Sequence, residues 1–456
     1  MAVRVLCGTL FTGREDTARK NCTLVIDNAG KIVFVGPAGD APRPGPQDVE
    51  YDYSALFVMP GLIDVHTHLA YGNAKCKEDI DLYQPLEFRA IRALYFAQSV
   101  LCAGYTSICA PGDAGQIAIA VRNAIKAGLF PGPRVMAGGR YLTNNQGFQD
   151  SYPSWIGVPE TAIAVMVRNP EEAIGEIRRQ VKNGVDCVKI DLDGVQLRPN
   201  GEIIASFTQG ETTTMVEEIH RLGRKAVAHA RGREAVLYAA RAGVDLIFHA
   251  AYIDDECIEA LVRSGSAIGP TLTFPRNTVD FTQPSEPAFK KGRVVAEQRE
   301  LDIACENLRK AKKAGVPLMT GTDTGFAVTP YGEWHAREIE LFVECLGFTP
   351  AEALRAATEV SARFIETDPV GILEPGRLGD FIAIDGSPLE NVSILLDKRR
   401  IRAVHLGGKP VSIPGRRNDY DPRQVTDRAW VSWTDLYTQE RVAALRAEGG
   451  TLAAAQ

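Results

Sequence analysis

The 456-residue sequence lacks several features that would place it in a membrane, nucleic-acid-binding or disulfide-rich class. It has no run of about 18 apolar residues, which a membrane-spanning helix requires, so we expect no contact with a membrane. Lys and Arg number 51 against 57 Asp and Glu, which gives a formal net charge of −6. A nucleic-acid groove needs a surface rich in Lys and Arg, so we expect no nucleic-acid partner either.

Cysteines are few, and none of the nine forms a CxxC pair. An odd number of scattered thiols favours reduced, buried cysteines over a disulfide framework. Residues 1–9 contain no long apolar stretch followed by a small-residue cleavage site. Together these patterns predict a cytoplasmic location.

The sequence does have ordinary globular composition, with 45% hydrophobic and 24% charged residues, and enough length for a large core. Between residues 59 and 364, short apolar segments alternate with amphipathic helical stretches. The predicted strands are 57–63, 107–110, 134–137, 187–190, 226–229, 246–249, 267–270 and 318–320. This alternation predicts an α/β fold, a (β/α)8 TIM barrel over 59–364. A doubly wound open sheet is the alternative, but the sequence has no Gly-rich dinucleotide turn.

Further strands are predicted on both sides of this region, near the start of the chain and again after residue 380. The N-terminal strands are too few to bury much surface alone, so we expect segments 1–58 and 365–415 to form one composite β-sandwich. Segment 416–456 contains Trp430, Trp433 and Tyr437 and a predicted helix at 438–447. We expect this tail to dock on the barrel or on a neighbouring subunit.

Four of the seven histidines lie at the ends of predicted barrel strands. His66 and His68 end the first strand, and residues i and i+2 of a strand point to the same face, so both imidazoles can bind one ion. His229 and His249 end two consecutive strands. A buried, hydrogen-bonded histidine is the simpler interpretation of either one alone, but the C-terminal strand ends of a barrel form its catalytic rim.

Asp323 follows the last predicted strand in the same way. It is a candidate metal ligand and general base, although an aspartate there could also cap a helix. Lys189 lies inside an otherwise apolar strand, where an unpaired ammonium would be costly. Two solutions stay open: an ion pair with Asp191 or Asp193, or carbamylation by CO2 to give an anionic ligand.

The segments PGLIDVHTH (60–68), VKI (188–190), AHA (228–230), FHA (248–250) and TGTDTG (320–325), in this order and spacing, resemble the amidohydrolase superfamily. The resemblance runs from the N-terminal strands to Gly408. Within the superfamily, the chain is most similar to the imidazolonepropionase-like group. That group includes Xaa-Pro dipeptidases, carboxypeptidases acting on acyl amino acids, and hydrolases of xenobiotic amides and ureas.

The resemblance implies two divalent ions, usually Zn²⁺, with Mn²⁺ or Co²⁺ as alternatives. It implies that His66, His68 and Asp323 hold the more buried ion and that His229 and His249 hold the outer one. Carbamylated Lys189 and a hydroxide would bridge the two. Asp323 would then be the catalytic residue that takes a proton from the nucleophile and returns it to the leaving nitrogen.

Five further residues are candidate substrate-binding residues. Arg231 and Tyr252 lie two and three positions beyond predicted ligands, and either could hold a substrate carboxylate. An ion pair between Arg231 and Glu234 is the alternative. Tyr141 and Asn145 belong to loop 138–147, which looks like the group's substrate loop although relatives often have a Gly-Gly-His stretch there. His335 also fits the group, and segments 70–86 and 148–155 are expected to shape the pocket.

The sequence therefore predicts a metal-dependent hydrolase that cleaves an amide-like C–N bond in a dipeptide, an N-acyl amino acid, or a xenobiotic amide, urea or carbamate. The alternatives are ring opening of a cyclic amide or deamination of a heterocycle at the same site. A non-catalytic relative that keeps the fold for assembly is more remote, because all six candidate ligands are present. The expected partner is a small-molecule substrate, and we expect the chain to form a homo-oligomer.

Overall fold

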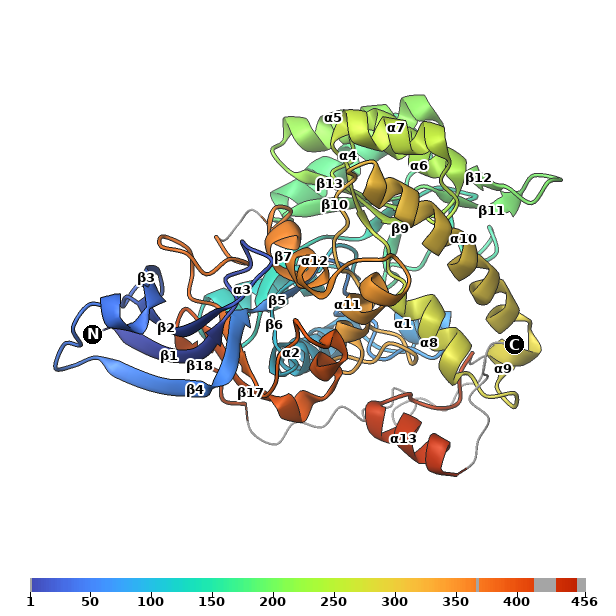
Figure 1. Ribbon diagram of the computed structural model, residues 1–456. Coiled ribbons are helices and arrows are strands. Elements are labelled where there is room, and N and C mark those ends of the chain that lie inside the picture. Colours follow the sequence, from blue (N-terminus) through green and yellow to red (C-terminus); the bar gives the residue numbers. More distant parts are fainter. Residues whose placement is uncertain (1, 366–368, 414–431, 449–456) are drawn as a thin grey trace.

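One sheet of seven strands combines the N-terminal strands with strands from residues 381–410 in this computed structural model, which describes residues 2–365, 369–413 and 432–448 (Figure 1). The strands follow the order β18-β17-β16-β4-β1-β2-β3. Their bounds are β1 (Val3–Leu10), β2 (Arg19–Ile26), β3 (Ile32–Pro37), β4 (Val49–Pro60), β16 (Phe381–Ile384), β17 (Ile401–Leu406) and β18 (Lys409–Pro410).

The N- and C-terminal segments meet where β4 and β16 pair in antiparallel fashion, with Phe381 opposite Pro60. Val5, Leu24 and Phe381 are buried in the same apolar cluster, so the N-terminal strands complete their core with the later segment. The strands of the two segments therefore share one sheet. A β-sandwich with two facing sheets is not confirmed.

The central strands pair in parallel and form two sheets, β5-β6-β7 and β15-β14-β13-β10-β8-β9. Their bounds are β5 (Leu62–Asp64), β6 (Tyr105–Ala110), β7 (Arg134–Ala137), β8 (Tyr141–Thr143), β9 (Ala164–Met166), β10 (Cys187–Asp191), β13 (Lys225–Ala230), β14 (Leu246–His249) and β15 (Ala267–Gly269). Nearly every residue of β6, β10, β13 and β14 is buried, as expected for strands covered on both faces.

Single parallel bridges connect these sheets at their margins. They join Gly138 to Cys187, Ile268 to Leu318, and Thr67 to Thr324. The chain therefore has a TIM-barrel-like α/β arrangement, but the sheets themselves are not closed. A complete barrel of eight units, and the division of the chain into three parts, stay predictions.

Helices cover the outside of the parallel strands, with α4 to α7 lying together beside β10 and β13 (Figure 1). The helices of this region are α1 (Lys77–Asp81), α2 (Leu86–Cys102), α3 (Ile117–Lys126), α4 (Pro170–Lys182), α5 (Gln209–Arg221), α6 (Arg233–Ala242), α7 (Asp255–Ser264), α8 (Thr273–Phe281), α9 (Pro287–Lys290), α10 (Arg293–Lys313), α11 (His335–Glu344) and α12 (Pro350–Arg355). Thr208 and Glu211 form a capping box at the start of α5, and Asn169 caps α4 ahead of Pro170. These local signals explain why the helices begin where they do.

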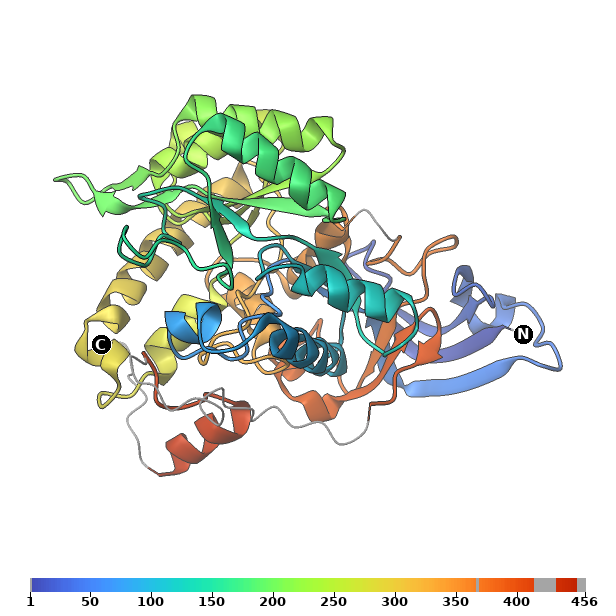
Figure 2. The ribbon, with the colours of Figure 1, turned by 180° about the vertical axis from the view of Figure 1, so that it is seen from behind.

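The described part of the C-terminal tail packs against α8 of its own chain. Helix α13 (Gln439–Ala447) is found below α8 and α9 in both ribbon views (Figures 1 and 2). Trp433 and Tyr437 are buried with Phe274 and Phe281 of α8 in one cluster. Trp430, which was also expected to dock, lies outside the described residues.

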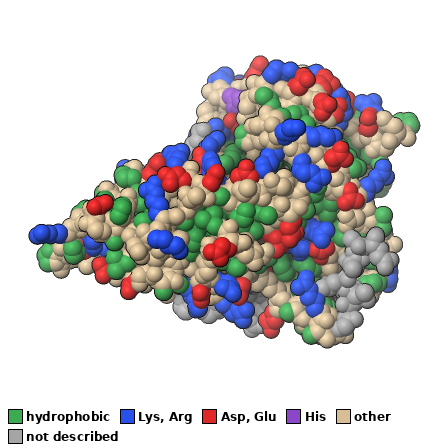
Figure 3. All heavy atoms as spheres, viewed as in Figure 1, with side chains coloured by type: hydrophobic (Ala, Val, Ile, Leu, Met, Phe, Trp, Pro, Cys, Tyr) green, Lys and Arg blue, Asp and Glu red, His purple; other side chains and the backbone are tan. Residues whose placement is uncertain are grey.

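Acidic and basic side chains are interspersed on the face drawn in Figure 3, without a single-sign surface. Of the helices in the described ranges, none combines the length and the apolar character needed to cross a bilayer.

Candidate metal centre

The six predicted metal ligands all lie at one end of the parallel strands. His66 and His68 follow β5, Lys189 lies within β10, His229 lies in β13, His249 ends β14 and Asp323 follows segment 318–320. The side chains are all buried. Because the carboxyl ends of parallel strands meet at one edge, residues far apart in the sequence converge here.

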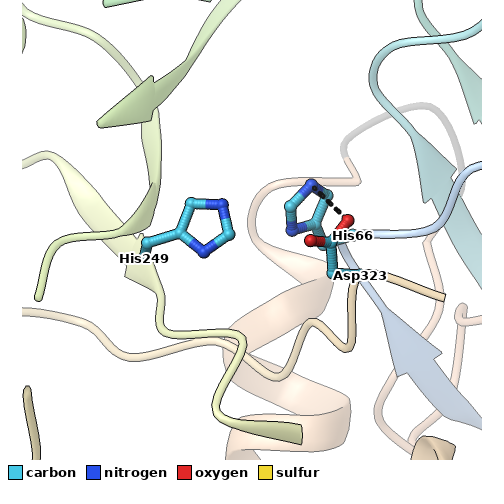
Figure 4. A group of neighbouring side chains, drawn as sticks. All are labelled: His66, His249 and Asp323. Atoms are coloured by element: carbon cyan, nitrogen blue, oxygen red, sulfur yellow. Dashed lines mark ion pairs between the residues drawn. The ribbon is translucent and has the colours of Figure 1, made fainter. Parts of the chain in front are cut away.

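His66, His68 and Asp323 form the tightest part of this group. Oδ1 of Asp323 lies 3.0 Å from Nε2 of His68 and 3.6 Å from Nε2 of His66, and the two Nε2 atoms are 3.1 Å apart. Together, His66, His249 and Asp323 offer one ligand atom each, all within 4.8 Å of one another. Figure 4 shows His249 pointing from its own strand toward His66 and Asp323.

Hydrogen bonds at the rear of two imidazoles determine which nitrogen is free to bind an ion. Nδ1 of His68 lies 2.6 Å from the carbonyl oxygen of Gly112, which can only accept, so Nδ1 donates and Nε2 keeps its lone pair. Nδ1 of His249 faces the hydroxyl of Thr271, which itself donates to the carbonyl of Pro270. His249 therefore donates from Nδ1 as well, and its buried Nε2 has no hydrogen-bond partner in the described chain.

The electrostatics of the group suit a cation. Burial lowers the pKa of His66, His68 and His249, so these imidazoles are neutral near pH 7. Burial alone would raise the pKa of Asp323, but the close contact with His68 and the positive charges of Lys189 and Arg231 outweigh it and lower that pKa. Neutral ring nitrogens that converge on a carboxylate are the donor set of a divalent metal site, so these residues fit such an ion.

Lys189 is fully buried next to these groups. Its Nζ lies 2.9 Å from Nε2 of His66 and 3.1 Å from the hydroxyl of Tyr141. In the described chain it has no ion pair with Asp191 or Asp193, the alternative that the sequence left open. Oδ2 of Asp191 instead accepts from the hydroxyl of Thr143. Burial lowers the pKa of Lys189 to about 8, so this amine loses its proton more readily than an exposed lysine does.

His229 lies beside His249, with ring centroids 4.5 Å apart. Its Nε2 is 3.3 Å from Oδ2 of Asp193, and Asp193 also accepts hydrogen bonds from the backbone of Arg231 and Gly232. Asp193 therefore holds the loop after β13 against the candidate ligand.

The backbone at these strand ends adopts an uncommon conformation. His249, Ala250, Thr271 and Asp323 all have positive φ angles, of 75°, 52°, 56° and 56°. Each such residue costs about 1–3 kcal/mol, and such conformations cluster at functional sites, where the surrounding structure holds them. In these conformations the imidazole of His249 and the carboxylate of Asp323 both point toward His66.

A cavity of about 290 Å³ opens beside the candidate ligands. Its walls include His66, Tyr71, Cys76, Lys77, Ile80, Tyr141, Phe148, Gln149, Ser151, Ile163, Lys189, His229, Arg231, Phe274, Arg293, Asp323, Phe326, Ser432 and Trp433. Segments 70–86 and 148–155 both contribute, as the sequence analysis expected.

The predicted substrate residues divide into two groups. Tyr141 and Arg231 line the cavity. Arg231 pairs with Glu300, 3.5 Å away, rather than with Glu234, because α10 passes over the end of β13. Tyr252 does not line the cavity in the described chain, and its hydroxyl lies 3.4 Å from the same Glu300.

The structure places Asn145 and His335 outside the set of described residues that line the cavity. Asn145 is exposed beside Asp150, because the loop after β8 turns outward before Phe148 returns to the cavity. His335 is buried at the start of α11, where its Nδ1 lies 2.7 Å from Oδ2 of Asp64 and its Nε2 accepts from the backbone of Gly332. It supports the strand end that bears His66 and does not reach the cavity.

Sequence reasoning missed several cavity residues, notably Phe274, Phe326 and Arg293. Phe274 and Arg293 come from α8 and α10, which carry no motif, and Phe326 directly follows the TGTDTG segment. For Trp433, the aromatic content of the tail was a signal, but nothing in the sequence indicated that it reaches the site.

Residues 57–411 match the amidohydrolase family. The chain belongs to this family. The resemblance inferred from the motifs is thereby confirmed, and this amidohydrolase is a hydrolase acting on carbon–nitrogen bonds.

Its relatives include ochratoxinase from Aspergillus niger, 27% identical over 439 residues, which are 90% of this chain and 87% of that protein. The crystal structure of A. niger ochratoxinase has a TM-score of 0.78 and 25% identity, covering 92% of this chain and 99% of that one. A crystal structure of a Xaa-Pro dipeptidase with bound methionine in its active site has a TM-score of 0.77 and 25% identity, covering 90% and 100% of the two chains.

Proposed function

We propose that this amidohydrolase cleaves an amide-like C–N bond of a small molecule at the metal centre formed by His66, His68, Lys189, His229, His249 and Asp323. One observation carries the proposal. Nε2 of His68 and Nε2 of His249 converge with Nε2 of His66 on the carboxylate of Asp323, and neutral imidazoles gathered around a carboxylate are the donor set of a divalent ion.

In this proposal His66, His68 and Asp323 hold one divalent ion, and His229 and His249 hold a second. Imidazole and carboxylate ligands favour Zn²⁺, with Mn²⁺ or Co²⁺ as alternatives. When bound, such ions polarise a carbonyl oxygen and lower the pKa of water toward neutrality.

Asp323 is the proposed proton carrier. Its pKa is lowered, so the carboxylate is ionised and can accept the proton of the attacking water. A C–O bond to the carbonyl carbon forms, the C–N bond breaks, and Asp323 returns the proton to the leaving nitrogen. Oδ1 of Asp323 lies 3.0 Å from Nε2 of the buried His68, so the carboxylate keeps one position for both transfers.

Lys189 is proposed to react with CO2, and the product would be a further anionic ligand for the ions. The neutral amine attacks the carbon of CO2, an N–C bond forms and one proton is released, which leaves an anionic carbamate. The lack of a carboxylate partner for Lys189 in the described chain, and its place beside His66 and Tyr141, support this modification.

The proposed substrates are dipeptides, N-acyl amino acids, and xenobiotic amides, ureas or carbamates. The similarity to ochratoxinase and to a Xaa-Pro dipeptidase supports this range. A cavity of about 290 Å³ with several aromatic walls suits a small molecule and excludes a folded polypeptide.

A hydrolysis panel of Xaa-Pro dipeptides, N-acyl amino acids and phenylureas, with elemental analysis of the same sample, tests the proposal. We expect turnover of at least one class, abolished in Asp323→Asn and retained in Asp302→Asn, which alters an exposed aspartate of α10. Metal-loaded protein that hydrolyses no member of the panel would contradict the proposal.

A further inference from the structure

The C-terminal segment forms one wall of the proposed substrate cavity. Ser432 and Trp433 line it together with Phe274 and Arg293, although they lie more than a hundred residues beyond the last candidate ligand. Trp433 is only 2% exposed, and its indole donates to the hydroxyl of Thr282. The tail therefore belongs to the architecture of the cavity.

Glu286 anchors this wall. Its buried carboxylate accepts hydrogen bonds from the backbone of Thr434 and Asp435 and from the hydroxyls of Thr434 and Tyr437. The backbone of Ser432 donates to the carbonyl of Lys75 at 2.7 Å. These bonds fix the backbone on both sides of Trp433 and so keep its side chain in the cavity wall.

Trp433 holds the guanidinium of Arg293 in place. Cζ of Arg293 lies 5.0 Å from the centroid of the Trp433 ring and 5.3 Å from that of Phe274, and the two rings meet edge to face. Such stacking orients the planar fork and leaves its edge free for a ligand.

Arg293 and Arg231 are both cavity arginines, but their partners differ. Nη1 of Arg231 pairs with Glu300. The Nη atoms of Arg293 have no hydrogen bond in the described chain, and its one ion-pair partner there, Glu297, lies 3.4 Å from Nε. Arg293 also begins the 21-residue helix α10, whose first turn has no acidic residue, so the helix dipole adds to the positive charge.

We propose that the fork of Arg293, held between Trp433 and Phe274, binds a carboxylate of the substrate, and that the C-terminal segment thereby sets the preference for acidic substrates. This inference rests on the proposed function. A planar carboxylate matches the paired donors of a guanidinium, whereas a neutral carboxamide offers one acceptor and no charge. The aromatic walls suit an aromatic side chain beside that carboxylate.

The test compares N-benzoyl-L-phenylalanine with its carboxamide, using kcat/KM for a compound that is turned over and the competitive inhibition constant for one that is not. We expect Arg293→Met to lower kcat/KM for the acid, or to weaken inhibition by it, about 10- to 150-fold. The same measurement for the carboxamide should change by less than about 3-fold, because a hydrogen bond to a charged group is lost for the acid alone. Trp433→Leu should also reduce kcat/KM for the acid or weaken inhibition by it. The same substitution should have a smaller effect in a protein that already carries Arg293→Met. Arg299→Met, which alters an exposed arginine of the same helix, should change neither compound.

Equal losses for acid and carboxamide, or an Arg293→Met variant that matches Arg299→Met, would overturn the inference. So would an enzyme that hydrolyses other amides but neither binds nor cleaves the acid. In both cases the proposed function would stand, because turnover of the wider panel by metal-loaded protein tests it separately.

Discussion

Nζ of Lys189 lies 2.9 Å from Nε2 of His66, and in the described chain no carboxylate lies within ion-pair distance of this buried amine. Burial lowers the pKa of Lys189 to about 8, and the charge of Asp323 opposes this shift only in part. In the proposed function, the deprotonated amine would take up CO2 and become a second anionic ligand beside Asp323.

Replacing Lys189 tests this role. We expect Lys189→Ala to bind less metal and lose activity, and short carboxylic acids added with the metal should restore part of both. Lys310→Ala, which alters an exposed lysine of α10, is the control. A high-resolution map of metal-loaded protein with an unmodified ammonium at Lys189 would contradict the assignment.

The histidines should control metal content. His66→Ala and His229→Ala are each expected to lower the number of divalent ions per chain, measured by elemental analysis after dialysis. His220→Ala is a matched control, because His220 is partly exposed and pairs with Asp245 away from the cavity. Full occupancy in both ligand variants would remove these residues from the site.

Asp323→Asn should lower kcat by at least about 10²- to 10⁴-fold, since proton transfer by a positioned base contributes this much and a ligand charge is lost too. Metal content is measured on the same sample to separate the two effects. A variant that keeps more than about a tenth of kcat would exclude Asp323 as the proton carrier.

Thr271 is expected to influence metal affinity although it is not a candidate ligand. Its hydroxyl accepts from Nδ1 of His249 and so directs Nε2 of that ring toward Asp323. Loss of such a partner typically costs about 10- to 100-fold in metal affinity. Thr271→Val is therefore expected to weaken metal binding within that range, measured by competition with a chelator, while Thr214→Val, at a half-buried position of α5, leaves it unchanged.

Two local rules predict from the sequence that the candidate ligands lie close together. Alternation along a strand puts His66 and His68 on one face. Parallel strands bring their carboxyl ends together, so His229, His249 and Asp323 are expected at the same edge. The starts of α5 and α7 depend instead on capping side chains, because Thr208 accepts from the backbone of Glu211 and Asp254 from that of Cys257.

Contacts between distant segments could not be predicted in this way. Arg231 pairs with Glu300 of α10 and not with Glu234 on the adjacent helix, because the packing of α10 brings that carboxylate nearer. His335 faces inward to Asp64, which no local pattern at the start of α11 indicates. These pairings depend on how elements pack, not on the period of any one element.

The anchoring of the tail provides a stability test. Glu286→Gln should detach the C-terminal segment partly, because an amide cannot accept all four hydrogen bonds that the carboxylate receives. A loss of about 1.5–3 kcal/mol is expected, seen as a lower Tm and faster proteolysis near residue 432. Glu306→Gln, at an exposed position of α10, should match the wild type, and a tail equally protected in both variants would contradict the anchoring role.

The most direct test of a metal-dependent hydrolase at this cluster is reconstitution. Protein is stripped with a chelator, checked by elemental analysis, and titrated with Zn²⁺ while hydrolysis of the best substrate of the panel is followed. We predict that activity disappears with the metal and returns in proportion to bound ions, up to about two per chain, and that His249→Ala does not recover. Metal-free protein that hydrolyses the substrate at the full rate would contradict the account.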